Sequence, residues 1–104
     1  MMLLTKANRK ALPGLLSQDG KGKQAIAHVK FFGGSDWSFY ASEFGDRGDG
    51  EEFFGLWSTS QGSELCSLSL EQLQSMRFPP FSLPAERDRY FKPCTLQECE
   101  DKRP

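Results

Sequence analysis

The chain has 104 residues, of which 38% are hydrophobic and 26% charged, and its formal net charge is −1. This length supplies one modest hydrophobic core and is too short for two, so we expect a single domain over residues 1–104. No apolar run approaches the roughly 20 residues that a membrane helix needs, and no segment has the pattern of a signal peptide. These features argue against a membrane-spanning helix and predict a cytoplasmic protein.

The cysteines and the one histidine give little support for a metal site. The chain has three cysteines, Cys66, Cys94 and Cys99, and its only histidine is His28. An odd number of cysteines is more typical of free thiols than of a disulfide framework. A structural zinc site needs four ligands, and these residues offer no well-spaced set. We therefore expect no metal ion and no cofactor.

Charge is unevenly distributed along the sequence. Residues 1–30 contain six Lys/Arg and a single Asp, whereas residues 31–76 contain eight Asp/Glu and a single Arg. Such asymmetry can mark a surface that meets a charged partner. Folding can equally interleave the two segments and cancel the field, and the sequence leaves both alternatives open.

The strongest secondary-structure signals are short strands rich in aromatic and β-branched residues. A glycine-rich turn at 33–36 separates the first two, which predicts a hairpin. In the first strand, strict alternation places Ala25, Ala27, Val29 and Phe31 on the core side. The four expected strands of one antiparallel sheet cover residues 25–32, 37–44, 53–58 and 64–68.

Short helices are expected around this sheet. Ser69 with Gln72, and Thr95 with Glu98, have the spacing of capping boxes, which predicts a helix after each. A helix over 6–12, capped by Thr5 and limited by Pro13, and a short helix over 85–91, begun by Pro84, are also predicted. The expected fold class is therefore α+β, a small antiparallel sheet of about four strands packed with two or three short helices.

The aromatic residues of the sheet suggest two interpretations. Alternation puts Phe32, Tyr40 and Phe54 on one face, opposite Phe31, Phe39 and Trp57. Exposed rings on a sheet can stack on nucleic-acid bases. The sheet region is acidic, however, and would repel phosphates. We therefore interpret these rings mainly as core residues.

Several motifs follow one another in a fixed order along nearly the whole chain. They include Val29-Lys30-Phe31-Phe32, Trp37-x-Phe39-Tyr40, Phe54-Gly55-Leu56, and Glu86-Arg87-Asp88 followed by Tyr90-Phe91-Lys92-Pro93. In this order they resemble an uncharacterised bacterial family, domain of unknown function 2958. The resemblance implies a protein of plasmids, phages or other mobile elements in a bacterial host, and it brings no catalytic residues with it. The acidic loop 45–52 is shorter than is usual in the family, and Cys66-Ser67 replaces an expected tyrosine.

The most enzyme-like cluster is Glu86-Arg87-Asp88. Paired carboxylates can hold Mg²⁺ for phosphodiester cleavage. Neighbouring residues of a helix do not share a face, however, so we favour a structural ion-pair network. His28 has no nucleophile motif beside it. We therefore expect no enzyme, and a metal-dependent nuclease is the least favoured alternative.

The resulting hypothesis is a small non-catalytic binding protein that inhibits a bacterial defence system by protein–protein contact, as an anti-CRISPR or anti-restriction protein. An acidic surface could meet the basic nucleic-acid-binding surface of a Cas or restriction component. The residues proposed for this contact are Glu43, Asp46, Asp49, Glu51 and Glu52. The alternative is direct nucleic-acid binding by the basic N-terminal segment. Its candidate residues are Lys6, Arg9, Lys10, Lys21 and Lys23.

Overall fold

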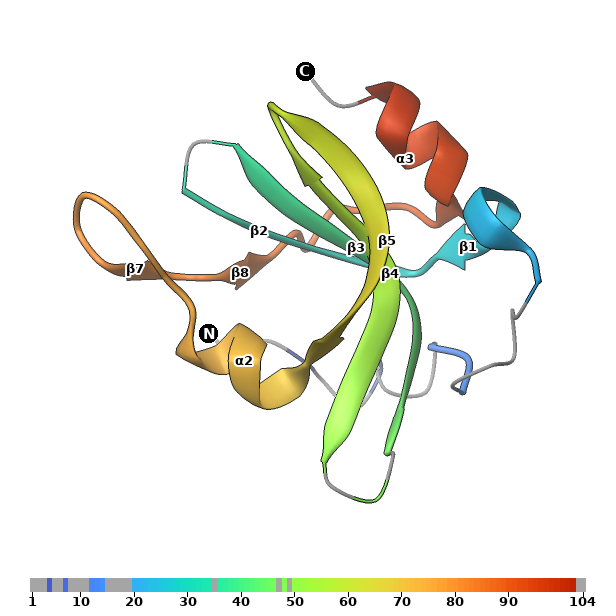
Figure 1. Cartoon of the computed structure of the whole chain (residues 1–104), viewed down its shortest axis with the longest axis horizontal. Coiled ribbons are helices and arrows are strands. Elements are labelled where there is room, and N and C mark those ends of the chain that lie inside the picture. Colours follow the sequence, from blue (N-terminus) through green and yellow to red (C-terminus); the bar gives the residue numbers. More distant parts are fainter. Residues whose placement is uncertain are drawn as a thin grey trace.

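Five strands form one antiparallel sheet in the computed structural model (Figure 1). The structure describes residues 4, 7, 12–14, 20–34, 36–46, 48 and 50–102. Across the sheet the strand order is β5-β4-β3-β2-β8, so only β8 joins out of sequence order. The strands are β2 (Val29–Gly33), β3 (Trp37–Asp46), β4 (Glu51–Thr59), β5 (Gly62–Ser69) and β8 (Glu86–Arg87).

The remaining elements are short and lie around this sheet. Two further pairs of two-residue strands form, one between β1 and β9 and the other between β6 and β7. These strands are β1 (Ile26–Ala27), β9 (Cys94–Thr95), β6 (Arg77–Phe78) and β7 (Leu83–Pro84). The helical elements described in full are η1 (Gly22–Gln24), α2 (Leu70–Ser75) and α3 (Leu96–Lys102).

A β-bulge in β3 decides which side chains enter the core. The register with β4 shifts between Ala41 and Glu43, and the hydroxyl of Ser42 donates a hydrogen bond of 3.0 Å to the Phe54 carbonyl. An extra residue reverses the alternation of the strand beyond it. Phe44 therefore points to the same side of the sheet as Ala41 and packs against Phe53, with ring centroids 4.6 Å apart.

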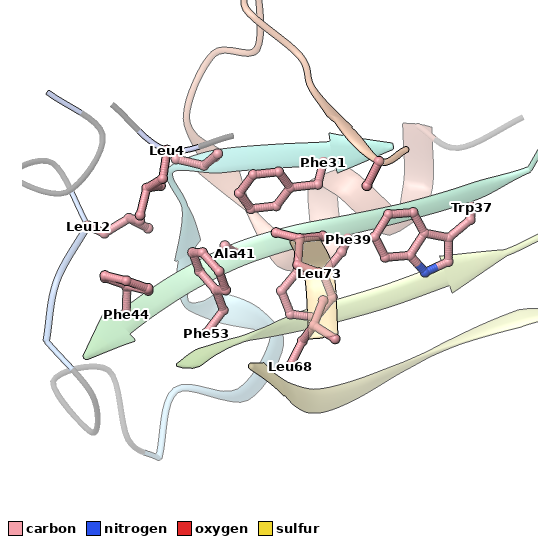
Figure 2. Packing of buried hydrophobic residues seen from close by; sticks show 12 residues of the cluster. Leu4, Leu12, Phe31, Trp37, Phe39, Ala41, Phe44, Phe53, Leu68 and Leu73 are labelled. Carbon is pink, nitrogen blue, oxygen red and sulfur yellow. The ribbon is translucent and has the colours of Figure 1, made fainter. Parts of the chain in front are cut away.

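The larger core cluster lies on one face of the sheet and is centred on aromatic rings (Figure 2). Phe31 meets Phe53 edge to face, with ring centroids 5.2 Å apart. Leu73 of α2 is completely buried against this face, and Leu4 and Leu12 close its other end. The capping box between Ser69 and Gln72 fixes the start of α2, as the spacing predicts.

A second, smaller cluster covers part of the opposite face. Tyr40 and Leu56, neighbours on β3 and β4, pack there against Leu96 and Cys99 of α3. The backbone amide of Leu96 donates to the Ala25 carbonyl at 2.9 Å, which holds α3 beside β1. The sheet is thus covered on both faces, by α2 on one and by α3 on the other.

The predicted α+β class of about four strands with two or three helices is wrong, because the protein is mostly β and its main sheet has five strands. The fifth strand, β8, falls where a helix over 85–91 was expected. Its residues pair with Phe31 and Phe32, and the Asp88 amide donates to the Lys30 carbonyl at 2.9 Å. An isolated helix this short has little stability of its own. Residues 86–87 therefore pair with the free edge of β2 and form a strand.

Other expectations were met in part. The predicted hairpin around 33–36 is confirmed, and all four alternating residues from Ala25 to Phe31 are buried. The expected strand 25–32 is interrupted at His28, whose amide donates a hydrogen bond to the Ala41 carbonyl. Residues before His28 pack in the smaller cluster, and residues after it pack in the larger cluster. Most of the predicted helix 6–12 lies outside the described residues. In the part of the chain that the structure describes, no helix is long and apolar enough to cross a membrane.

Candidate functional site

A groove of about 760 Å³ lies on the face of the sheet that α3 covers only in part. Its floor is formed by side chains that point to this face from three neighbouring strands. These are Lys30 and Phe32 of β2, Ser38 and Tyr40 of β3, and Ser58 of β4. We call it the Lys30–Lys92 groove, after the cations of its floor and of its wall.

The wall of the groove is the segment from Asp88 to Cys94, which follows β8. The Asp88 carboxylate accepts a hydrogen bond of 2.9 Å from the Tyr90 amide, which forms a tight turn. After this turn Tyr90 is 85% exposed, and Phe91 packs against Tyr40 with ring centroids 6.0 Å apart. Pairing of β8 with β2 is therefore what positions the wall over the floor.

The carboxylates that line the groove are already engaged within the protein. Asp88 accepts from the Tyr90 amide, and Asp36 accepts from the Ser60 hydroxyl at 2.7 Å and from its amide at 3.3 Å. The lysines differ, because neither Lys30 nor Lys92 forms an ion pair with another described residue. Lys30 lies over the Tyr40 ring, 5.5 Å from its centroid. The groove therefore places two ammonium groups and two hydrogen-bonded carboxylates beside aromatic surface.

The groove has the size of a ligand pocket, since its volume falls within the roughly 300–1,000 Å³ that such pockets occupy. Its lining combines aromatic rings, hydroxyl groups, two ammonium groups, two carboxylates and two thiols. His28, whose pKa is lowered by burial, does not line it. Among the described residues, no three His, Cys, Asp or Glu side chains gather closely enough to hold a metal ion.

A comparison with protein families places this chain. The model described as "Protein of unknown function (DUF2958)" matches residues 3–97, which include both the floor and the wall of the groove. The chain belongs to the DUF2958 family. The resemblance seen in the sequence is thereby confirmed. No curated protein and no solved structure matches the chain.

The acidic residues predicted as a partner surface of this DUF2958 protein differ in their exposure and in their place in the fold. Glu43 is only 4% exposed and lies within β3, inside the predicted strand 37–44. Asp46 is exposed, and its carboxylate accepts from the Gly48 amide at 2.7 Å. Glu51 and Glu52 are half-buried at the start of β4, and Asp49 lies outside the described residues. Strand extends into both ends of the predicted loop 45–52, since Gly45 pairs with Glu52 and Asp46 with Glu51.

The basic residues proposed for nucleic-acid binding do not form one described surface either. Lys23 is half-buried and makes an ion pair of 2.8 Å with Glu100. Lys21 is exposed beside η1. Lys6, Arg9 and Lys10 lie outside the described residues.

Sequence reasoning missed the groove, although its residues stood within the family motifs. Lys30, Tyr90 and Lys92 belong to two motifs about 60 positions apart, and no spacing rule connects them. Their proximity follows from the β2–β8 pairing, which an expected helix over 85–91 conceals. The one usable signal was the exposed pairing edge of β2, because an edge strand tends to be covered by another segment.

Proposed function

We propose that this DUF2958 protein is a small non-catalytic binding protein and that its ligand lies in the Lys30–Lys92 groove. The observation that carries the proposal is the pair Lys30 and Lys92, which form no ion pair with another described residue and lie beside exposed aromatic rings. Phe32 is 36% exposed and Tyr90 85% exposed, so each is accessible to a planar group. Large aromatic side chains left in water at a concave site are typical of a binding surface.

The chemistry of the groove favours a ligand that carries both a planar ring and an anion. Ammonium groups bind phosphate, and aromatic rings stack on bases whatever their identity. Hydroxyl groups of Ser38 and Ser58 can hydrogen-bond to a sugar or a base. We therefore propose a nucleotide, or a short single strand of nucleic acid, as the ligand. This moves the nucleic-acid hypothesis from the N-terminal lysines to the groove.

The test is calorimetric titration of the full chain with nucleoside monophosphates and with a short single-stranded oligonucleotide. Tyr90→Ala should weaken binding by about 1–3 kcal/mol if a base stacks on this ring. Lys92→Gln should weaken it and flatten its dependence on salt concentration. Lys21→Gln is the matched control, because Lys21 is also exposed but lies outside the groove. Equal losses in the Lys92 and Lys21 variants, or saturable binding of uncharged peptides alone, would contradict the proposal.

A second candidate is the inhibition of a bacterial defence complex by an acidic surface, in a protein of a mobile element. What supports it is the β3–β4 hairpin, which projects beyond the rest of the sheet (Figure 1) and exposes Asp46 near its end. A projecting acidic hairpin could enter a basic nucleic-acid channel of a Cas or restriction protein. Glu43 is too buried to take part directly.

This candidate has its own experiment. A variant with Asp46, Asp49, Glu51 and Glu52 replaced by Asn or Gln is compared with the unaltered chain in CRISPR-interference and restriction assays. Loss of inhibition with unchanged thermal stability would support the acidic hairpin. Inhibition that persists after all four changes would contradict the acidic-surface candidate. The absence of inhibition by the unaltered chain would contradict it as well.

A further inference from the structure

Two of the three cysteines lie in direct contact. The Sγ atoms of Cys94 and Cys99 are 3.1 Å apart, and both residues line the end of the Lys30–Lys92 groove. All three cysteines are free thiols in the structure. Cys94 is half-buried, whereas Cys99 is only 2% exposed.

Local structure explains why these two thiols meet. The Thr95 hydroxyl accepts from the Glu98 amide, and the Glu98 carboxylate accepts from the Thr95 amide, each at 3.1 Å. This reciprocal capping box makes Thr95 the residue before the first turn of α3. Cys94 then precedes the cap and Cys99 is the fourth helical residue. These are the two positions that a hydrophobic staple brings together at a helix start.

Contacts on both sides hold this arrangement. Cys94 pairs with Ala27 across the β1–β9 ladder, and Leu96 donates its amide to Ala25. Leu96 and Cys99 are both buried in the cluster beneath α3. The strand that carries Cys94 and the first residue of α3 are therefore held by backbone contacts that do not involve the sulfur atoms.

We infer that Cys94 and Cys99 form a redox-active dithiol that a small-molecule disulfide, such as oxidised glutathione, converts into an intramolecular disulfide. The more accessible Cys94 thiolate attacks one sulfur of the glutathione disulfide and releases one glutathione thiolate. Cys99 then attacks the Cys94 sulfur of the mixed disulfide and releases the second. Two electrons pass to the reagent, two glutathione thiols form, and the protein loses two hydrogens. Neighbouring sulfur atoms need only a small side-chain movement for the second step.

The test is equilibration of the folded full chain in glutathione buffers of increasing oxidised fraction, followed by acid quenching, unfolding and alkylation. In reduced buffer three cysteines should be alkylated. In oxidising buffer only Cys66 should be alkylated. The tryptic peptide that holds Cys94 and Cys99 should then be lighter by two hydrogens than the mass calculated for its unalkylated dithiol form. Alkylation of all three thiols at every buffer composition would overturn the inference.

Two single variants separate the dithiol from ordinary thiol oxidation. Cys99→Ser removes the resolving thiol, so a glutathione adduct should accumulate on Cys94 where the unaltered chain carries none. Cys66→Ser should leave the formation of the disulfide unchanged, because Cys66 lies on β5, outside the groove. A stable adduct on Cys94 in the unaltered chain, or a disulfide that requires Cys66, would refute the assignment.

Discussion

The Lys23 ammonium nitrogen lies 2.8 Å from a carboxylate oxygen of Glu100, although 77 positions separate the two residues. The hydroxyl of Ser63 donates to the same carboxylate oxygen. One side chain of α3 is thus bonded to η1 and to β5. Lys23, one of the five basic residues named for the alternative nucleic-acid-binding surface, thus forms an ion pair with the last helix.

Replacing Glu100 by Gln should lower the free energy of unfolding by up to about 1 kcal/mol, the range for partly exposed ion pairs. Urea unfolding of the single variants and of the Lys23→Gln, Glu100→Gln double variant would measure the coupling between them. Lys21→Gln is the control, because this neighbouring lysine is exposed. Additive effects of the two changes would show that the ion pair contributes nothing.

Gly55 should be intolerant of any side chain. A Cβ atom at this position would overlap the Tyr40 carbonyl oxygen on the neighbouring strand, and backbone atoms cannot move aside as a side chain can. We expect Gly55→Ala to destabilise the protein by about 1–3 kcal/mol, as overpacking does. Gly14→Ala is the control, because no atom lies within 4 Å of the added Cβ there. Similar thermal midpoints for the two variants would contradict this close approach of β3 and β4.

Leu73 should contribute more to stability than any exposed leucine. It is fully buried where α2 covers the larger cluster (Figure 2), so Leu73→Ala should cost about 2–5 kcal/mol. Leu65→Ala makes the same chemical change at a residue that is 37% exposed, and it should cost much less. Chemical denaturation of both variants checks the difference. Equal costs would mean that α2 is not packed as described.

His28 should make the protein less stable in mild acid. Burial lowers the pKa of His28 from its ordinary value of 6.5, so the unfolded chain binds the proton more tightly than the folded one. Stability is therefore retained above the unfolded-state pKa and declines as the pH falls below it. Urea midpoints measured at about pH 8 and about pH 5 should differ less in His28→Gln than in the unaltered chain. An identical pH dependence in both proteins would show that His28 does not contribute.

Local patterns predicted the local features well. Capping boxes located the starts of α2 and α3, and the glycine turn located the β2–β3 hairpin, because each depends on residues within a few positions of one another. Alternation also identified the buried residues of β1 and β2. These features arise from backbone hydrogen bonds and side-chain direction, which neighbouring residues determine.

Features that depend on distant contacts were not predictable in the same way. The helix expected over 85–91 became β8 because β2 offered an unpaired edge, and the bulge at Ser42 placed Phe44 in the core through its register with β4. The Lys30–Lys92 groove could not be predicted for the same reason. Lys30 lies on β2 and Lys92 in the wall, and only the β2–β8 pairing brings these two segments together. Pairing partners are chosen by the whole fold, so a single sequence does not reveal them.

The position of β8 beside β2 also has a consequence for synthesis on the ribosome. The chain emerges from its N-terminal end, so β2, β3 and β4 are complete well before the segment from Asp88 to Cys94 appears. Until then the edge of β2 is open and Tyr40 lacks its partner Phe91. A nascent chain therefore has the strands of the groove floor without its wall, and we expect the proposed ligand to bind only after the C-terminal segment has been synthesised.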